Sequence, residues 1–262
     1  MTDHTTLKTS LDGGVLEVRL SRPETLNALN RAMKQELIAA FKAAARAQEV
    51  RVVLLSAEGR GFCSGADLKS GEEDSEKSFG ESVRTLYNPM VEAITQLRKP
   101  VVAAVQGVAA GAGMSLALAC DIRLCGESAQ FIAAFSRIGL VPDSGLSYFL
   151  PRLVGLGKAM ELAMLAEPVD AQEALRLGLA NGVYPDEELA AAAKDVCRRL
   201  AEGPLYALGL TKQALQRGQE LRLGEALEYE AGLQELAGRS GEYREGVEAF
   251  RERRKANYRT LD

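Results

Sequence analysis

Histidine is almost absent from this sequence of 262 residues. The single histidine, His4, lies among polar residues close to the N-terminus, where we expect a frayed chain end. Ser-His-Asp and Cys-His catalytic sites both require a positioned imidazole base. The sequence therefore argues against these classes of enzyme, and carboxylates, lysines or tyrosines would have to carry any proton transfer.

Cysteine is also scarce, and the four cysteines of the chain form no CxxC pair. They are Cys63, Cys120, Cys125 and Cys197. With only one histidine beside them, the spacing of zinc ligands is missing, so we expect no metal site. A few scattered cysteines are typical of a reducing cytosol, and residues 1–10 lack the apolar core of a signal peptide. These features predict a cytoplasmic protein.

An excess of positive charge is missing too, because the net charge is -4 and the sequence pI is about 5.4. We therefore expect neither nucleic acid nor a membrane as a partner. Residues 101–120 carry no charge and are numerous enough to cross a bilayer. However, Gln106, Ser115 and three glycines interrupt this run. We interpret it as a strand, a loop and a helix of a buried core.

The hydrophobic pattern predicts alternating strands and helices, which is typical of the α/β class. The predicted strands are residues 15–20, 51–56 and 101–105. Asn30 can cap a helix that follows it, and a second helix is predicted over residues 81–97, where Lys99-Pro100 ends it. From about Asp143 onward the pattern is almost entirely helical, with turn signals at 203–204, 218 and 240–241.

Glycine-rich loops follow the second and third predicted strands, at residues 61–68 and 107–113. Glycines let a ligand approach the backbone closely, so one N–H from each loop could stabilise a developing oxyanion. The alternative is that both loops are ordinary tight turns between a strand and a helix. Neither loop has the glycine pattern of nucleotide-binding proteins.

Six motifs, in order along the chain, resemble the crotonase (enoyl-CoA hydratase/isomerase) superfamily. They lie at residues 20–29, 61–68, 99–113, 119–123, 139–142 and 249–258. The resemblance implies an α/β fold with a crotonase-like ββα spiral core over residues 1–202 and a C-terminal helical trimerisation region over residues 203–262. It also implies a homotrimer or a hexamer of two trimers. The substrate would be an acyl-CoA thioester, with no cofactor beyond its coenzyme A moiety.

The resemblance also assigns the catalytic positions. Ala66 and Ala112 fall where the family has its oxyanion amides, and Asp143 falls where members that shift double bonds in dienoyl-CoA esters have their acting aspartate. Ser115 and Phe135 occupy the positions of the two glutamates of the family's hydratases. Neither side chain can exchange a proton as those glutamates do, so the resemblance implies isomerisation.

Phe135, Asp143 and the loop 107–113 are most similar to the isomerase branch of the family that acts on ring-1,2-epoxyphenylacetyl-CoA in phenylacetate degradation. Asp143 would then act as acid and base in an apolar environment, which makes a carboxylate a stronger base. From the residues alone an alternative stays open. Residues 142–145 are also a good turn sequence, in which Asp143 would cap the following helix.

Eight further positions match residues of the family that bind coenzyme A. They are Arg22, Leu26, Ala28, Asp67, Leu68, Lys69, Phe250 and Arg253. In the family, the positions of Phe250 and Arg253 are often contributed across subunits. The basic residues at 251–255 could bind phosphates, or they could complement the C-terminal dipole of a helix.

Two other functions stay open. One is an enoyl-CoA hydratase with the same fold. The other is a non-catalytic RNA-binding homologue, known for one branch of the superfamily, although the low pI argues against it. Tyr87 and Tyr148 could line the acyl pocket, or they could be buried core residues.

Overall fold

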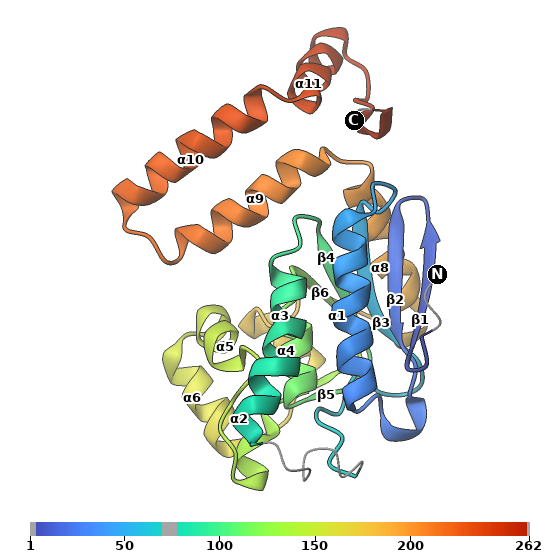
Figure 1. Cartoon of the computed structure of the whole chain (residues 1–262), viewed down its shortest axis with the longest axis vertical. Coiled ribbons are helices and arrows are strands. Elements are labelled where there is room, and N and C mark those ends of the chain that lie inside the picture. The colour runs from blue at the N-terminus through green and yellow to red at the C-terminus, as the bar shows by residue number, and fades with distance from the viewer. Residues whose placement is uncertain (1–3, 70–77, 261–262) are drawn as a thin grey trace.

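The computed structural model describes residues 4–69 and 78–260, which form two sheets surrounded by helices (Figure 1). The main sheet has six strands in the order β1-β2-β3-β4-β6-β9, and a small sheet has the order β5-β7-β8. The strands are β1 (Leu7–Asp12), β2 (Val15–Leu20), β3 (Val52–Ala57), β4 (Val101–Val105), β5 (Val108–Ala110), β6 (Ile122–Gly126), β7 (Gln130–Ile132), β8 (Val169–Asp170) and β9 (Gly182–Tyr184). In the main sheet only β1 and β2 are antiparallel neighbours.

Helices cover both faces of the main sheet, with α1 and α8 on opposite sides (Figure 1). The α-helices are α1 (Arg31–Arg46), α2 (Phe79–Ser82), α3 (Asn88–Thr95), α4 (Ala112–Leu118), α5 (Leu146–Val154), α6 (Leu156–Leu165), α7 (Ala171–Leu177), α8 (Asp186–Ala201), α9 (Leu205–Gly218), α10 (Leu223–Gly238) and α11 (Gly241–Glu252). Short helical turns are η1 (Pro23–Thr25), η2 (Val83–Tyr87), η3 (Ala134–Ile138) and η4 (Tyr258–Thr260).

The centre of the sheet is apolar on both faces because each face packs against helices. On β3, Val52 and Leu54 belong to the cluster that α8 covers, whereas Val53 and Leu55 belong to the cluster beneath α1 and α3. A strand buried on both sides needs a continuous apolar run, as parallel strands usually have. The predicted strands at 15–20 and 101–105 are confirmed, and the strand predicted at 51–56 lies one residue further along.

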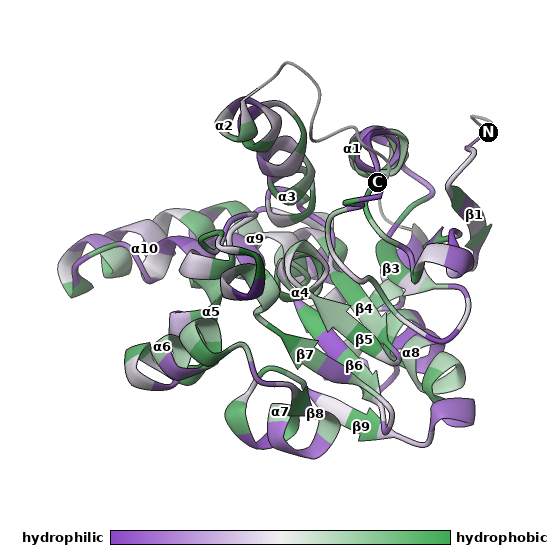
Figure 2. Ribbon diagram, turned by 90° about the horizontal axis from the view of Figure 1, so that it is seen from below, coloured by the Kyte–Doolittle hydropathy of each residue, from purple (hydrophilic) through white to green (hydrophobic). Residues whose placement is uncertain are grey.

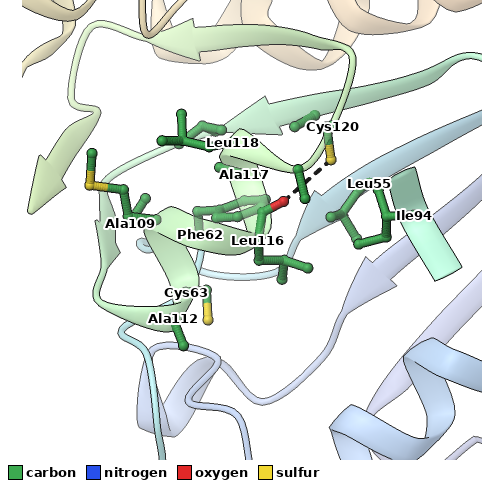
Figure 3. Packing of buried hydrophobic residues seen from close by; sticks show 14 of the residues in the cluster. Leu55, Phe62, Cys63, Ile94, Ala109, Ala112, Leu116, Ala117, Leu118 and Cys120 are labelled. Atoms are coloured by element: carbon green, nitrogen blue, oxygen red, sulfur yellow. Dashed lines mark hydrogen bonds between the residues drawn. The ribbon is translucent and has the colours of Figure 1, made fainter. Parts of the chain in front are cut away.

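Residues 101–120 form β4, β5 and α4, as we expected from the glycines that interrupt the run. Every residue of α4 is buried, and Figure 2 shows this short helix near the centre of the molecule. Its residues Leu116 and Leu118 belong to the same buried cluster as Phe62 (Figure 3). Within the described residues, none of the helices combines the length and the apolar character that crossing a membrane requires.

The helix predicted at 81–97 is interrupted by one π-helical turn. The chain forms α2, then the π turn η2, then α3, which ends at Thr95. Pro89 lacks an N–H, and its ring would clash with a carbonyl one turn back in a regular α-helix. The N–H of Asn88 bonds instead to the carbonyl of Val83, five residues earlier. Proline therefore explains the break.

Residues 4–6, where the described part of the chain begins, are tied to the fold, so the expectation of a frayed chain at His4 was wrong. The N–H groups and hydroxyls of Thr5 and Thr6 donate to the carboxylate of Glu36 on α1 over 2.7–2.9 Å. Burial alone would raise the pKa of Glu36, but these hydrogen bonds outweigh it and lower the pKa to about 2. His4 lies beside the same carboxylate, 3.9 Å away, and takes no part in the candidate site described below.

The C-terminal part consists of α9, α10 and α11, which extend away from the sheet (Figure 1). The helix α9 begins after the predicted turn at 203–204 and ends at the one at 218, and α11 begins at the predicted turn at 240–241. The segment between Asp143 and α9 is less helical than expected, because β8 joins the small sheet and β9 joins the main sheet beside β6.

Gly107 occupies a position at which any side chain should destabilise the fold. Its φ is 54°, and a Cβ there would lie 1.9 Å from the carbonyl oxygen of Arg60. We expect Gly107→Ala to lower the free energy of unfolding by about 3 kcal/mol or more, because the left-handed backbone and the overlap both penalise alanine. Gly157→Ala in α6, where a Cβ meets no atom within 4 Å, should change it by less than about 1 kcal/mol. Equal stability of the two variants in urea unfolding would contradict this close approach.

Candidate active site

A cavity of about 580 Å³ brings the three predicted catalytic residues together. Ala66, Ala112 and Asp143 all line it, although they come from three different segments of the chain. The aromatic side chains of Phe135 and Tyr87 line the same cavity. The predicted catalytic set is therefore gathered in one place by the fold.

The two glycine loops meet backbone against backbone. The N–H of Cys63 donates to the carbonyl of Val108 over 3.0 Å, and the N–H of Ala110 donates to the carbonyl of Cys63 over 2.9 Å. A Cβ on Gly65 would lie 2.8 Å from the carbonyl oxygen of Ala110 and 3.6 Å from the nitrogen of Ala112. Figure 3 shows Cys63 and Ala112 side by side at this contact. Glycine at position 65 is what allows the loops to come this close.

The amides of Ala66 and Ala112 are both available to a ligand. Ala66 pairs with Leu29 in a parallel bridge, in which the flanking residues of the loop make the hydrogen bonds, so its own N–H points away from Leu29. Ala112 is the first residue of α4 and has no acceptor inside the helix. Within residues 4–69 and 78–260, neither N–H donates to another backbone group. The positive φ, 52°, falls on Gly111 and not on Ala112, so alanine at 112 is unstrained.

Asp143 lies in a tight turn in front of α5. The N–H of Leu146 donates to the carbonyl of Asp143 over 2.9 Å, and Ser144 and Gly145 both have positive φ. A turn is present, but it spans residues 143–146 and lies one residue later than the sequence suggested. The cap is not present, because Gly145 is the N-cap of α5 and no side chain caps this helix. The carboxylate of Asp143 is half-buried at the cavity and accepts a hydrogen bond from the hydroxyl of Ser144 over 2.8 Å.

Ser115 and Phe135 supply no second proton-transfer group. Ser115 is fully buried, and its hydroxyl lies 3.3 Å from the carbonyl oxygen of Gly111 and 3.2 Å from that of Asp143. Phe135 presents a phenyl ring to the cavity. Among the described residues that line the cavity, Asp143 is the one carboxylate.

Cys63 sits beside the amide pair and could be mistaken for a nucleophile. Burial raises the pKa of its thiol to about 12, which keeps the thiol protonated. Cys63 therefore behaves as a core residue.

Six of the eight predicted coenzyme A residues gather around the first glycine loop. Arg22 donates to the carbonyl of Ala28 over 2.6 Å and pairs with the carboxylate of Asp67 over 2.8 Å. Leu26 accepts from the N–H of Ser64, which belongs to that loop. The two remaining residues follow Asp67 directly: Leu68 lines the cavity, and Lys69 is exposed.

Phe250 and Arg253 are not brought to this site within one chain. They lie at the end of α11, at the opposite end of the molecule from α2 and α5 (Figure 1). Phe250 is 85% exposed, which is unusual for a large apolar side chain.

Lys34 is a buried residue near the site that we did not single out from the sequence. Its ammonium lies 4.0 Å from the ring centre of Tyr87, a cation–π contact that can contribute about 2 kcal/mol when desolvated. Its burial could have been predicted from the sequence, because Lys34 lies on the apolar stripe of α1, three residues before Leu37. Tyr87 is thus both buried and part of the cavity wall. Tyr148 is neither, because it is 38% exposed and contacts Arg152.

The parallel sheet, the paired amides and the adjacent carboxylate define an α/β protein with a cavity suited to stabilising an oxyanion. The chain belongs to the enoyl-CoA hydratase/isomerase family, whose model matches residues 10–260. It has the α/β crotonase fold: a crystal structure of enoyl-CoA hydratase from Bacillus anthracis superposes with a TM-score of 0.91 at 32% identity, covering 97% of this chain and 99% of that one. Enzymes of this family act on acyl-CoA thioesters and generally need no cofactor.

Two relatives are more similar in sequence. The 1,2-epoxyphenylacetyl-CoA isomerase of Escherichia coli strain K12 is 42% identical over 251 residues, covering 95% of this chain and 96% of that protein. A Rhodobacter capsulatus protein named "Probable enoyl-CoA hydratase" is 41% identical over 253 residues, covering 97% of both chains.

The ion pair of Arg22 should contribute more to the stability of the fold than an ion pair on the surface does. Arg22→Met removes a largely buried ion pair and a hydrogen bond to a backbone carbonyl. We expect a loss of about 3 kcal/mol in the free energy of unfolding, since breaking such a pair leaves a buried carboxylate less well stabilised. Lys8→Met removes a comparable but exposed pair with Glu58 and should cost less than about 1 kcal/mol. Chemical denaturation of both variants tests the difference.

Proposed function

We propose that this protein isomerises an acyl-CoA thioester by a mechanism with one base, Asp143. The observation that carries the proposal is the composition of the cavity. Among its described lining residues, it joins two backbone amides that can stabilise an enolate to one carboxylate, and it has Phe135 where a second carboxylate would be needed to hold and protonate a water molecule.

In the proposed reaction the thioester carbonyl accepts hydrogen bonds from the N–H groups of Ala66 and Ala112. The carboxylate of Asp143 takes a proton from the acidified carbon of the acyl group, and the electron pair of that C–H bond delocalises onto the thioester oxygen as an enolate. Asp143 then returns the proton to another carbon of the conjugated system, which moves the double bond. The amides contribute most at the enolate stage, where the negative charge is greatest.

We further propose an aromatic acyl group, as in ring-1,2-epoxyphenylacetyl-CoA. The name of the 42% identical relative supports this choice, and the rings of Phe135 and Tyr87 offer apolar walls for a flat acyl group. On such a substrate the same electron flow would accompany ring expansion to an oxepin: the C–C bond shared by the epoxide and the six-membered ring breaks, both C–O bonds remain, and Asp143 returns the proton to a ring carbon. The reaction would then belong to phenylacetate catabolism, and a 3-enoyl-CoA of fatty acid metabolism is the alternative substrate.

A hydratase is the second candidate, and the name of the Rhodobacter relative favours it. Hydration requires an ordered water molecule between two proton-transfer groups. Ser115 and Phe135 argue against that arrangement. An RNA-binding role has less support, because the chain has a net charge of -4.

We expect Asp143→Asn to reduce the isomerisation of 3-enoyl-CoA and dienoyl-CoA esters by at least ~100-fold, the scale of losing a general base. Ultraviolet absorbance of the conjugated thioester follows the reaction. Glu161→Gln is the matched control, because it removes an exposed carboxylate on the neighbouring α6 that pairs with Lys158. An active Asp143→Asn variant would remove this residue from the mechanism, and rapid hydration of 2-enoyl-CoA by the wild type would favour the hydratase.

We also propose that the region 203–262 assembles the chain into a trimer or a hexamer. No residue of α10 is buried, although Leu223 and Leu227 on this helix are large and apolar. Such exposed apolar residues usually belong to an interface. In this assembly, Phe250 and Arg253 of one chain would reach the coenzyme A moiety held by another.

Phe250→Ala and Arg253→Ala should therefore raise KM for acyl-CoA several-fold and leave kcat nearly unchanged, because uniform binding is lost without loss of chemistry. Light scattering should give three or six chains of 28.1 kDa. A monomer with wild-type KM in both variants would contradict this arrangement.

We further propose a cytoplasmic location, which is supported by the four buried, free cysteines.

A further inference from the structure

We propose that Ser115 and Ser144 are positioning residues, which hold Asp143 in a fixed geometry relative to the oxyanion amides. This inference rests on the proposed role of Asp143 as the base. Each serine makes a different contact with that residue: Ser115 reaches its backbone carbonyl, and Ser144 reaches its carboxylate.

Ser115 connects the helix of the oxyanion site to the turn of the base. It is the fourth residue of α4, whose first residue is Ala112, and its N–H donates to the carbonyl of Gly111 over 3.1 Å. Its hydroxyl lies 3.2 Å from the carbonyl oxygen of Asp143, which belongs to a segment 28 residues further along the chain. One helical turn therefore carries an oxyanion amide and contacts the base.

The hydroxyl of Ser115 has an ordinary structural partner as well. A serine in a helix commonly bonds to the carbonyl four residues back, here that of Gly111 at 3.3 Å. That bond would satisfy the buried hydroxyl by itself. A hydroxyl has one hydrogen, so the two carbonyl oxygens compete for it, and the shorter distance, 3.2 Å, is the one to Asp143. A positioning role requires this bond to Asp143.

Ser144 is unusual because it is a serine in a left-handed conformation. Its φ is 51°, a region that favours glycine, and the residue is almost completely buried. A glycine there would relieve the backbone strain, but it would lose the hydroxyl that donates to Oδ1 of Asp143 over 2.8 Å. Strained residues that persist in a fold are concentrated at functional sites. The hydroxyl gives a physical reason for keeping serine.

Fixed geometry matters here because the base and the amides act on the same acyl group. The amides fix the thioester oxygen, so the carbon that loses its proton lies at a set distance from Ala112. A displacement of about 1 Å between a catalytic group and its target can lower a rate by ~100-fold. Ser115 and Ser144 restrain Asp143 from two directions, through its main chain and through its side chain.

The test is to measure kcat, KM and the melting temperature of Ser144→Gly and Ser115→Ala, with Ser115→Cys as the variant that keeps the size of the side chain. We expect Ser144→Gly to melt at a higher temperature than the wild type, yet to have a kcat about 10-fold lower or more. Ser115→Ala should show a similar fall in kcat with KM within about 2-fold of wild type, and Ser115→Cys should be intermediate because a thiol donates weakly.

Thr95→Val is the matched control, since it removes a hydroxyl that donates to the carbonyl of Val91 on α3 over 3.1 Å. It should leave kcat unchanged. A purely structural role of the serines predicts that activity follows stability, so a Ser144→Gly variant that is both more stable and fully active would overturn the proposal. Full activity of Ser115→Ala would do the same for Ser115.

Failure of this inference is distinguishable from failure of the proposed function. If Asp143→Asn keeps its activity, Asp143 is not the base, and there is nothing for the serines to position. If Asp143→Asn is inactive while both serine variants turn over at the wild-type rate, only the positioning role is contradicted.

Discussion

The structure depends on the direct contact between the backbones of two glycine loops. The loop after β3 and the loop after β4 exchange hydrogen bonds between Cys63, Val108 and Ala110. They come close enough that a Cβ at Gly65 or Gly113 would overlap a carbonyl oxygen of the other loop. Without this contact, the amides of Ala66 and Ala112 would belong to separate turns. With it, they form one site at the start of a fully buried helix.

The second requirement is that one carboxylate be placed against that site. Asp143 arrives from a distant segment, and the turn that carries it contains two residues with left-handed backbone. A cavity in which Asp143 is the one carboxylate among the described lining residues favours moving a proton within the substrate over adding water, because addition needs a second group to hold the water molecule. The family membership shows the substrate class, and this arrangement supports the choice of reaction within it.

The sequence predicted the α/β class, the alternation of strands and helices and the grouping of Ala66, Ala112 and Asp143, because these follow from hydrophobic periodicity and from the family motifs. It did not predict features that depend on single tertiary contacts. Residues 4–6 are held in place by hydrogen bonds to Glu36, thirty residues away from Thr6. The π turn follows from Pro89, and the burial of Lys34 follows from the position of Tyr87. From the sequence, Asp143 could be either a catalytic residue or a helix cap, and the structure excludes the cap because the N-cap of α5 is Gly145.

The central claim is that one base moves a proton and no water is added. A single turnover of 3-enoyl-CoA in water labelled with oxygen-18 and deuterium, followed by mass spectrometry of the thioester, tests it directly. We predict a 2-enoyl product that carries no oxygen-18 and at most one deuterium, since Asp143 transfers a single proton. A hydroxyacyl product that carries oxygen-18 would contradict the account.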